Sequence, residues 1–187
     1  MSLRSLGPKL LALSVLLALG APELLAQTQI ISLAAVAAGN LSVTIQSGGI
    51  QTIAGIADNA VTSFPSPVVI QTAWNLNPGQ TNTVDLMAYF SLPAQAMVGG
   101  STLIPSSRVL GRMTTGLPTT FTAITQNGIG GIGPAGGSLH LFSVNIGSAN
   151  KNANRTDNLD LQLNLVGFPS LPAGNYIGVL NIRAVTQ

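Results

Sequence analysis

The chain has 187 residues and a formal net charge of +2, with only 6% charged and 4% aromatic residues. So small a charge, with no basic stripe, argues against nucleic acid as a partner. The chain contains no cysteine, which excludes disulfides, thiolate metal sites and a cysteine nucleophile. Its polarity comes from Ser, Thr, Asn, Gln and Gly, which predicts a neutral surface rich in hydrogen-bonding groups.

Residues 1–26 have the layout of a secretory signal peptide. Arg4 and Lys9 form a basic start, residues 10–19 are an apolar run, and small residues precede a cleavage site after Ala26. The apolar run is shorter than the roughly 20 residues that a membrane-spanning helix needs. An uncleaved anchoring helix is the alternative interpretation.

After cleavage, residues 27–187 would form a single mature domain. No second apolar span follows in the sequence, so we expect no membrane span in the mature protein. We expect it to be secreted, to the periplasm, the cell surface or the extracellular space.

The mature chain opens with patterns typical of β-strands. Residues 28–38 are apolar, and residues 41–46 alternate apolar side chains with Ser, Thr and Gln. An alternation of period two predicts a strand with one buried face. Residues 47–63 are Gly-rich at their start and fit either a further strand or an irregular loop.

Two alternating runs flank the sequence Asn-Pro-Gly-Gln-Thr-Asn at residues 77–82. The first run places Ile70 and Trp74 on one face, and the second covers residues 83–90. Pro followed by Gly favours a turn, so the two runs predict a β-hairpin. The alternation places Trp74 with the core side chains and Tyr89 with the exposed ones.

The middle of the chain continues this pattern. Residues 104–113 and 121–126 predict short strands, and residues 127–137 predict a flexible Gly-rich loop. Residues 138–146 change phase midway, which predicts a β-bulge. Residues 148–158 predict a polar loop.

Two further strands complete the chain. Residues 159–165 carry leucine at every second position and predict a core strand, and residues 175–185 predict a final strand. Eight or nine short strands with no amphipathic helix after the leader predict an all-β fold. We expect the fold class to be an immunoglobulin-like antiparallel β-sandwich preceded by a signal peptide helix.

One polar segment offers candidate metal ligands. Asn152, Asn154 and Asp157 supply alternating side-chain oxygens, an arrangement that suggests Ca²⁺. The Gly and the closing Glu of a calcium loop are missing. Pairing of Asp157 or Asp160 with a surface arginine is the alternative, and we expect no metal and no cofactor.

The patterns of catalytic sites are weak in this sequence. His140 is the only histidine and lies between two leucines, so we expect it on the surface of a strand. No Gly-x-Ser-x-Gly elbow occurs, and residues 127–137 lack the Lys-Ser/Thr of a phosphate-binding loop. The mature chain has four Asp and no Glu to supply a carboxylate pair. We therefore expect a protein that is not an enzyme. A hydrolase that uses His140 is the least favoured hypothesis.

The C-terminal sequence Leu-Pro-Ala-Gly-Asn-Tyr-Ile-Gly-Val-Leu-Asn-Ile-Arg-Ala-Val, residues 171–185, carries a family resemblance. It resembles the last hairpin of secreted bacterial immunoglobulin-like domains, in which a Pro-Ala-Gly-x-Tyr turn leads into an alternating final strand. The same ending occurs in subunits of surface fibres, including pilins of the spore-coat-U type. The resemblance implies a fibre subunit that donates an N-terminal strand to the next copy.

Residues 28–38 are the candidate donor strand, with Ile30, Ile31, Leu33 and Val36 as the self-assembly residues. Pairing within its own domain is the alternative, which the tendency of sequential strands to be neighbours favours. The scarcity of charge suits association between strands, because charged edges are the usual guard against it.

We therefore predict a secreted, non-enzymatic structural or interaction protein, a self-assembling cell-surface or fibre subunit. Its partners would be copies of itself or other surface proteins. The alternative is a carbohydrate-binding or adhesin module that binds glycans, with Trp74 and Tyr89 as the candidate ligand-binding residues.

Overall fold

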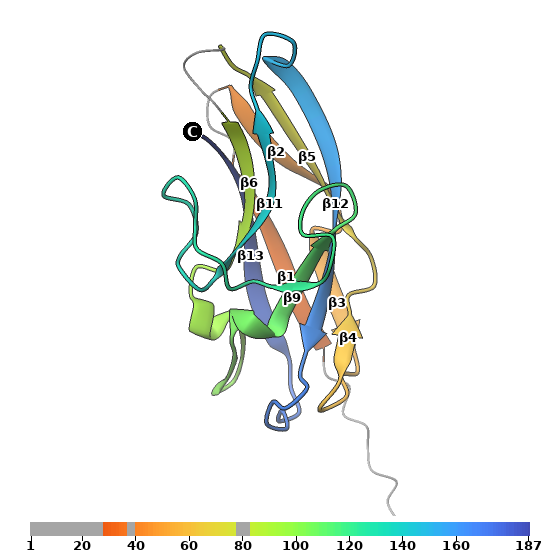
Figure 1. The fold of residues 1–187 in the computed structure, drawn as a ribbon. Coiled ribbons are helices and arrows are strands. Elements are labelled where there is room, and N and C mark those ends of the chain that lie inside the picture. Colours follow the sequence, from red (N-terminus) through yellow and green to blue (C-terminus); the bar gives the residue numbers. More distant parts are fainter. Residues whose placement is uncertain (1–27, 37–39, 78–82) are drawn as a thin grey trace, which may run out of the picture.

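A computed structural model describes residues 28–36, 40–77 and 83–187 (Figure 1). The predicted signal peptide, residues 1–26, lies outside the described residues. The described chain is all-β, with two facing sheets and two short 3₁₀-helices. Within these ranges no helix is long and apolar enough to cross a membrane.

The first sheet has the strand order β11-β6-β13-β1-β3, and β7 pairs with both β13 and β8. Its strands are β1 (Thr28–Val36), β3 (Ile50–Ala54), β6 (Thr83–Tyr89), β7 (Met97–Gly99), β8 (Thr102–Ile104), β11 (Ser138–Asn145) and β13 (Tyr176–Thr186).

The second sheet has the order β10-β9-β12-β5-β2, and β4 pairs with β12. Its strands are β2 (Leu41–Ser47), β4 (Val61–Ser63), β5 (Val68–Asn75), β9 (Val109–Met113), β10 (Thr122–Ala123) and β12 (Asn152–Asn164). The 3₁₀-helices η1 (Pro93–Gln95) and η2 (Ser106–Arg108) lie in the connection from β6 to β9.

The core lies between the two sheets, as the alternation predicts. Leu159, Leu161 and Leu163 of β12 are buried, and the polar residues between them are half-buried on the other face. They belong to one hydrophobic cluster with Leu86 of β6 and Leu180 of β13. Each buried leucine contributes about 1.5–3 kcal/mol before the cost in conformational entropy. The predicted β-sandwich is confirmed.

The predicted hairpin around residues 77–82 is wrong. β5 belongs to the second sheet, between β12 and β2, whereas β6 belongs to the first sheet, between β11 and β13. The chain therefore passes from one sheet to the other at this point. Both strands show the expected alternation, but alternation specifies which face is buried and not which strand is the neighbour.

The predicted polar loop over residues 148–158 is wrong for its second half. β12 begins at Asn152 and pairs with β5 from Asn152 to Leu159 before it pairs with β9. Asn and Asp are depleted in strands, and pairing with β5 overrides this preference. Residues 47–63, which had no clear prediction, contain β3 and β4.

The β-bulge predicted within residues 138–146 is confirmed. The register between β11 and β6 shifts between His140 and Phe142. Leu139, Leu141 and Phe142 are all buried as a result.

The Gly-rich segment of residues 127–137 forms a tight hairpin. Ile129 and Ile132 exchange backbone hydrogen bonds of 3.0 and 2.9 Å across Gly130 and Gly131. Both glycines have positive φ angles, 58° and 75°, which a two-residue hairpin turn requires. A Cβ on Gly130 would lie 2.9 Å from Val185 Cγ2, so this hairpin, hereafter the glycine hairpin, lies against β13.

Candidate functional site

The sequence predicts that the N-terminal strand takes part in self-assembly, so the candidate site is the position of β1 in the first sheet. β1 pairs with β13 from Gln29 to Val36, and this pair is parallel. On its other side β1 pairs antiparallel with β3, from Thr28 to Ser32. The other described strand pairs are antiparallel, so the predicted antiparallel sandwich differs at this one pair. β1 thus pairs within its own chain, as the favoured alternative predicts.

The predicted self-assembly residues divide into two pairs. Ile31 is 0% exposed and belongs to the core cluster, and Leu33 is half-buried against it. The side chains of Ile30 and Val36 lie outside the described part of the structure. β1 therefore contributes directly to the hydrophobic core, and its removal would open that core at Ile31.

Next to β1, glycines of β13 and β7 let the backbone lie very close to neighbouring atoms. A Cβ on Gly178 of β13 would lie only 2.1 Å from the carbonyl oxygen of Ala96. A Cβ on Gly99 of β7 would meet the Tyr176 ring at 2.5 Å. Tyr176 is buried, and its hydroxyl donates a 2.9 Å hydrogen bond to the carbonyl oxygen of Pro172. These contacts fix the start of β13, on which β1 depends.

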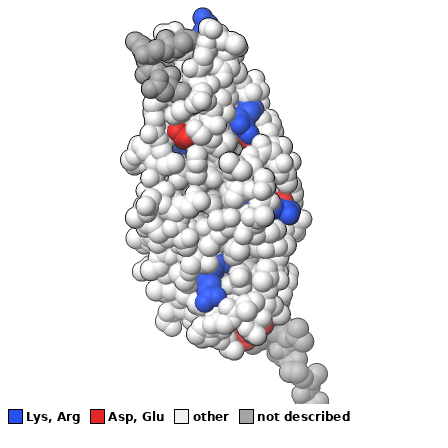
Figure 2. All heavy atoms as spheres, viewed as in Figure 1, with Lys and Arg blue, Asp and Glu red and all other residues white. Residues whose placement is uncertain are grey.

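The two sheets end on strands without charge. β3 reads Ile-Gln-Thr-Ile-Ala at one end of the first sheet, and β2 reads Leu-Ser-Val-Thr-Ile-Gln-Ser at one end of the second. Figure 2 shows only a few charged side chains on the visible face, some of them next to a side chain of opposite charge. Edge strands usually carry Lys or Pro, which oppose pairing with another chain. Neither strand carries Lys or Pro, although β2 has a bulge, another protective feature, between Ile45 and Ser47.

The outer face of the first sheet carries an apolar patch. Ile177 and Val179 of β13 are about half exposed, and Val98 of β7 lies opposite Ile177. Leu103 of β8 lies opposite Val98. Leu92 is also exposed, and together with Ile177 and Val179 it lines a hollow of about 290 Å³. Apolar side chains grouped in this way are typical of contact surfaces.

Trp74 is not placed to stack on a glycan. The residue is 5% exposed, and its Nε1 donates a 2.8 Å hydrogen bond to the carbonyl oxygen of Asn150. Tyr89 is half-buried, and a Cβ on Gly133 of the glycine hairpin would lie 3.2 Å from its Cβ. The two candidate ligand-binding residues lie in different sheets, and the structure does not bring them together.

The candidate calcium ligands are also separated. Asn152 and Asn154 are exposed on β12, whereas Asp157 is 0% exposed on the inner face. Arg155 Nε and Nη2 donate hydrogen bonds of 2.6 Å to the two oxygens of Asp157. Thr115 Oγ1 donates another of 2.7 Å. Asp157 thus forms an ion pair with Arg155, which is the alternative to calcium binding that the sequence analysis gave.

His140 contacts a buried carboxylate. Its Nε2 lies 3.1 Å from Asp85 Oδ1, and Asp85 is 5% exposed on the outer face of β6. The His140 side chain is about one third exposed, so it is partly at the surface, where the sequence predicts it. Sequence reasoning missed this pair, because residues 85 and 140 are far apart in the chain.

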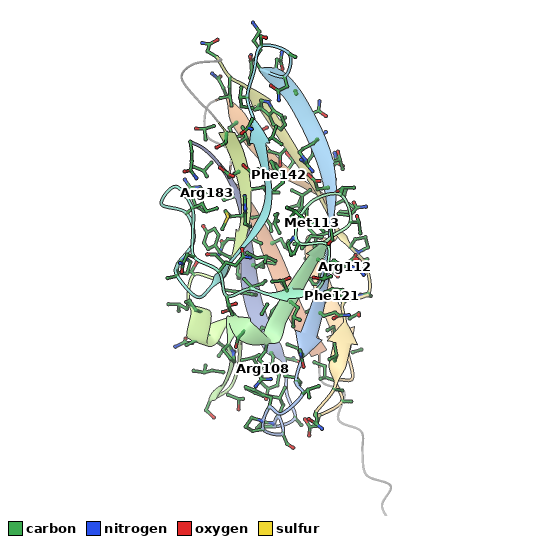
Figure 3. The ribbon with its side chains drawn as sticks, in the orientation of Figure 1. Arg108, Arg112, Met113, Phe121, Phe142 and Arg183 are labelled. Atoms are coloured by element: carbon green, nitrogen blue, oxygen red, sulfur yellow. The ribbon has the colours of Figure 1, made fainter. Side chains whose placement is uncertain are left out.

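A cleft of about 320 Å³ opens between β9, β12 and the segment after β4. Arg112 donates a hydrogen bond to Asp160 and lies 4.6 Å from the centre of the Phe121 ring. Figure 3 shows Arg112 and Phe121 side by side. Gln162 completes the polar lining and donates a 3.0 Å hydrogen bond to Ser63. The sequence offered no signal for this cleft, because its residues come from four separate segments.

No family model matches the chain, and no curated protein matches its sequence.

Proposed function

We propose that this protein is a secreted, non-enzymatic structural subunit that self-associates by strand exchange. Strand exchange here means that β1 of one copy occupies the place between β13 and β3 of another copy. The observation that carries the proposal is the position of β1, which lies between two strands of its own sheet and fills the core with Ile31. A second copy can supply the same strand with the same contacts, so exchange costs little contact energy.

The connection to β2 supports exchange. β1 ends at Val36 in the first sheet, and β2 begins at Leu41 in the second. Four residues span at most about 14 Å when fully extended. Short connections between elements favour domain swapping.

The surface supports association rather than catalysis. The uncharged strands β2 and β3 offer edges for further pairing, and the apolar patch around Ile177 offers a face. Several charged groups take part in internal pairs, Arg155 with Asp157 and Arg112 with Asp160. Export is supported by the leader pattern of residues 1–26.

Light scattering of the mature chain, residues 27–187, tests this proposal. We expect dimers or longer assemblies after refolding at high concentration, and discrete particles or fibres in negative-stain images. A chain that lacks residues 28–36 should lose these assemblies and bind a synthetic peptide of that sequence. The matched control is the same peptide with Ile31→Asp, which should not bind. A mature chain that stays monomeric at every concentration would overturn the proposal.

Glycan binding is the second candidate, and the cleft at Arg112 is the observation that favours it. An aromatic ring beside an arginine, a carboxylate and an amide offers the combination of apolar and hydrogen-bonding groups that sugars require. Phe121→Ala should abolish binding on a glycan array, and Trp74→Phe, which leaves the cleft intact, should not. Failure of the unmodified protein to bind any glycan would reject this candidate.

A further inference from the structure

A cluster of four polar side chains lies on the outer face of the first sheet. Thr83 and Asp85 are two residues apart on β6, the central strand of the cluster, and so share a face. His140 comes from β11 on one side of β6, and Gln187 follows β13 on the other. The proposed strand exchange uses none of these residues.

Asp85 holds the cluster together. Its side chain is 7% exposed, and its two oxygens divide the partners between them. Thr83 Oγ1 donates a 3.0 Å hydrogen bond to Oδ2, and Gln187 Nε2 donates one of 3.4 Å to the same oxygen. His140 Nε2 lies 3.1 Å from Oδ1. One carboxylate oxygen therefore holds a hydroxyl and a primary amide next to each other.

The backbone places Thr83 and Gln187 directly opposite one another. Thr83 N donates a 2.8 Å hydrogen bond to Gln187 O, and Gln187 N donates a 3.1 Å hydrogen bond to Thr83 O. In an antiparallel ladder, such a reciprocal pair has its side chains on the same face, with Cα atoms about 5.5 Å apart. The hydroxyl of Thr83 and the side-chain amide of Gln187 thus lie within reach of each other.

The glycine hairpin lies next to this pair. A Cβ on Gly130 would lie 3.5 Å from Gln187 Nε2 as well as 2.9 Å from Val185 Cγ2. Met87 of β6 and Ile132 of the hairpin are both buried although they lie outside the core between the sheets. The hairpin therefore removes part of the water from the surroundings of Asp85, which is 5% exposed, whereas Thr83 is half-buried and Gln187 is exposed. Exclusion of water around the carboxylate strengthens the action of a charged base.

We propose that Thr83 and Gln187 react with each other to form an intramolecular ester. Asp85 accepts the hydroxyl proton of Thr83 while Oγ1 attacks the side-chain carbonyl carbon of Gln187, which forms the new C–O bond. The tetrahedral intermediate then collapses, the C–N bond breaks, and Asp85 returns the proton to the leaving nitrogen. The products are the ester and one molecule of ammonia, and no oxidant or cofactor is consumed.

Asp85 is the catalytic residue of this step, because it touches both reacting groups. His140 is a positioning residue, because it contacts Asp85 Oδ1 and directs Oδ2 toward the reacting pair. Fixing two groups in this way replaces a bimolecular encounter by an intramolecular one, which accelerates acyl transfer strongly. The ester would tie the start of β6 to the end of β13, in a chain whose sequence has no cysteine for a disulfide.

Mass spectrometry of the folded mature chain tests the proposal. We expect an intact mass lower than the sequence mass by one ammonia, and a proteolytic fragment that joins the peptide containing Thr83 to the one containing Gln187. Mild alkaline hydrolysis should separate the two peptides. Cyclisation of Gln27 at a processed N-terminus also releases ammonia, so the joined fragment is the deciding result.

Variants separate the chemistry from a structural role. Thr83→Val removes the nucleophile and should abolish the joined fragment, whereas Thr83→Ser should keep it. Asp85→Asn should abolish it and His140→Gln should lower its yield, each in a chain whose folding is verified by circular dichroism. Thr186→Val is the matched control, since Thr186 adjoins Gln187 but lies opposite Val84, and it should leave the yield unchanged. Separate peptides with intact Thr83 and Gln187 from the folded, unmodified chain would overturn the proposal.

Discussion

Arg155 and Asp157 stand two residues apart on β12 and form a bidentate ion pair in which the carboxylate is completely buried. The guanidinium of Arg155 also lies 4.2 Å from the centre of the Phe142 ring. The pair thus links the polar half of β12 to the bulged strand β11 of the other sheet. It explains how a strand that begins with Asn, Arg, Thr and Asp is held in a sandwich.

Asp157→Ala should destabilise the fold by about 3 kcal/mol, the lower end of the range for removing one partner of a buried pair. The lower end applies because Arg155 keeps 26% of its side chain exposed and can recover some hydration. Urea unfolding measures this change. Asn158→Ala, at the half-buried neighbouring position, is the control and should change the stability far less. Equal losses in the two variants would contradict the assigned role of the pair.

Calcium should have no effect on thermal unfolding. Arg155 occupies both oxygens of Asp157, and no group of three or more His, Cys, Asp or Glu side chains suited to a metal ion exists among the described residues. Scanning calorimetry with millimolar calcium and with a chelator should therefore give the same Tm. An increase in Tm with calcium would revive the site predicted at Asn152, Asn154 and Asp157.

The leucines of β12 should be far more important for stability than the exposed valine of β13. Leu163→Ala removes a 0% exposed side chain and should cost about 2–5 kcal/mol. Val179→Ala changes a side chain that is 49% exposed and should stay within about 0.5 kcal/mol. Chemical denaturation of the two variants makes the comparison. A large loss for Val179→Ala would mean that the outer face is covered in solution.

Gly178 should not tolerate a side chain. A methyl group there would collide with the carbonyl oxygen of Ala96, so Gly178→Ala should cost about 1–3 kcal/mol by overpacking and shift β13. Gly49→Ala is the control, because its Cβ would meet Ile45 at an ordinary contact distance of 3.5 Å. Thermal unfolding that separates the two variants by several degrees is the expected result. Indistinguishable variants would show that Gly178 of β13 and Ala96 are not in close contact.

The parts of the fold that depend on one strand at a time were predictable from the sequence. Leucines at every second position predicted the buried face of β12, and the change of phase after Leu141 predicted the bulge in β11. The pairing partner of each strand was not predictable, because the alternation of apolar and polar residues is the same whichever strand lies next to it. Hence the hairpin between β5 and β6 was wrong, and the parallel pairing of β1 with β13 was not foreseen.

The candidate site shows the same limit. Burial of Ile31 follows from the apolar sequence of β1, and burial of Trp74 follows from its alternation. The contact between His140 and Asp85 and the cleft at Arg112 depend on tertiary structure, which brings distant segments together. The pair formed by Arg155 and Asp157 did carry a signal, since opposite charges two residues apart on a strand share a face.

The measurement that tests the central claim most directly is disulfide trapping between two single-cysteine variants. Ser32 of β1 and Val179 of β13 are register partners, and adjacent strands lie about 4.7–4.9 Å apart, which suits a disulfide. Ser32→Cys and Val179→Cys are unfolded together, refolded as a mixture and oxidised. The native chain has no cysteine, so only the introduced cysteines can form disulfides, and a disulfide that joins position 32 to position 179 reports this contact.

Strand exchange predicts a mixed disulfide dimer that contains one copy of each variant. A mixture of Ser32→Cys with Thr44→Cys, an exposed position on β2 of the other sheet, is the control and should give little mixed dimer. The result that would contradict the account is a lack of mixed dimer, together with an efficient intrachain disulfide in a chain that carries both Ser32→Cys and Val179→Cys. β1 would then pair only with the chain to which it belongs.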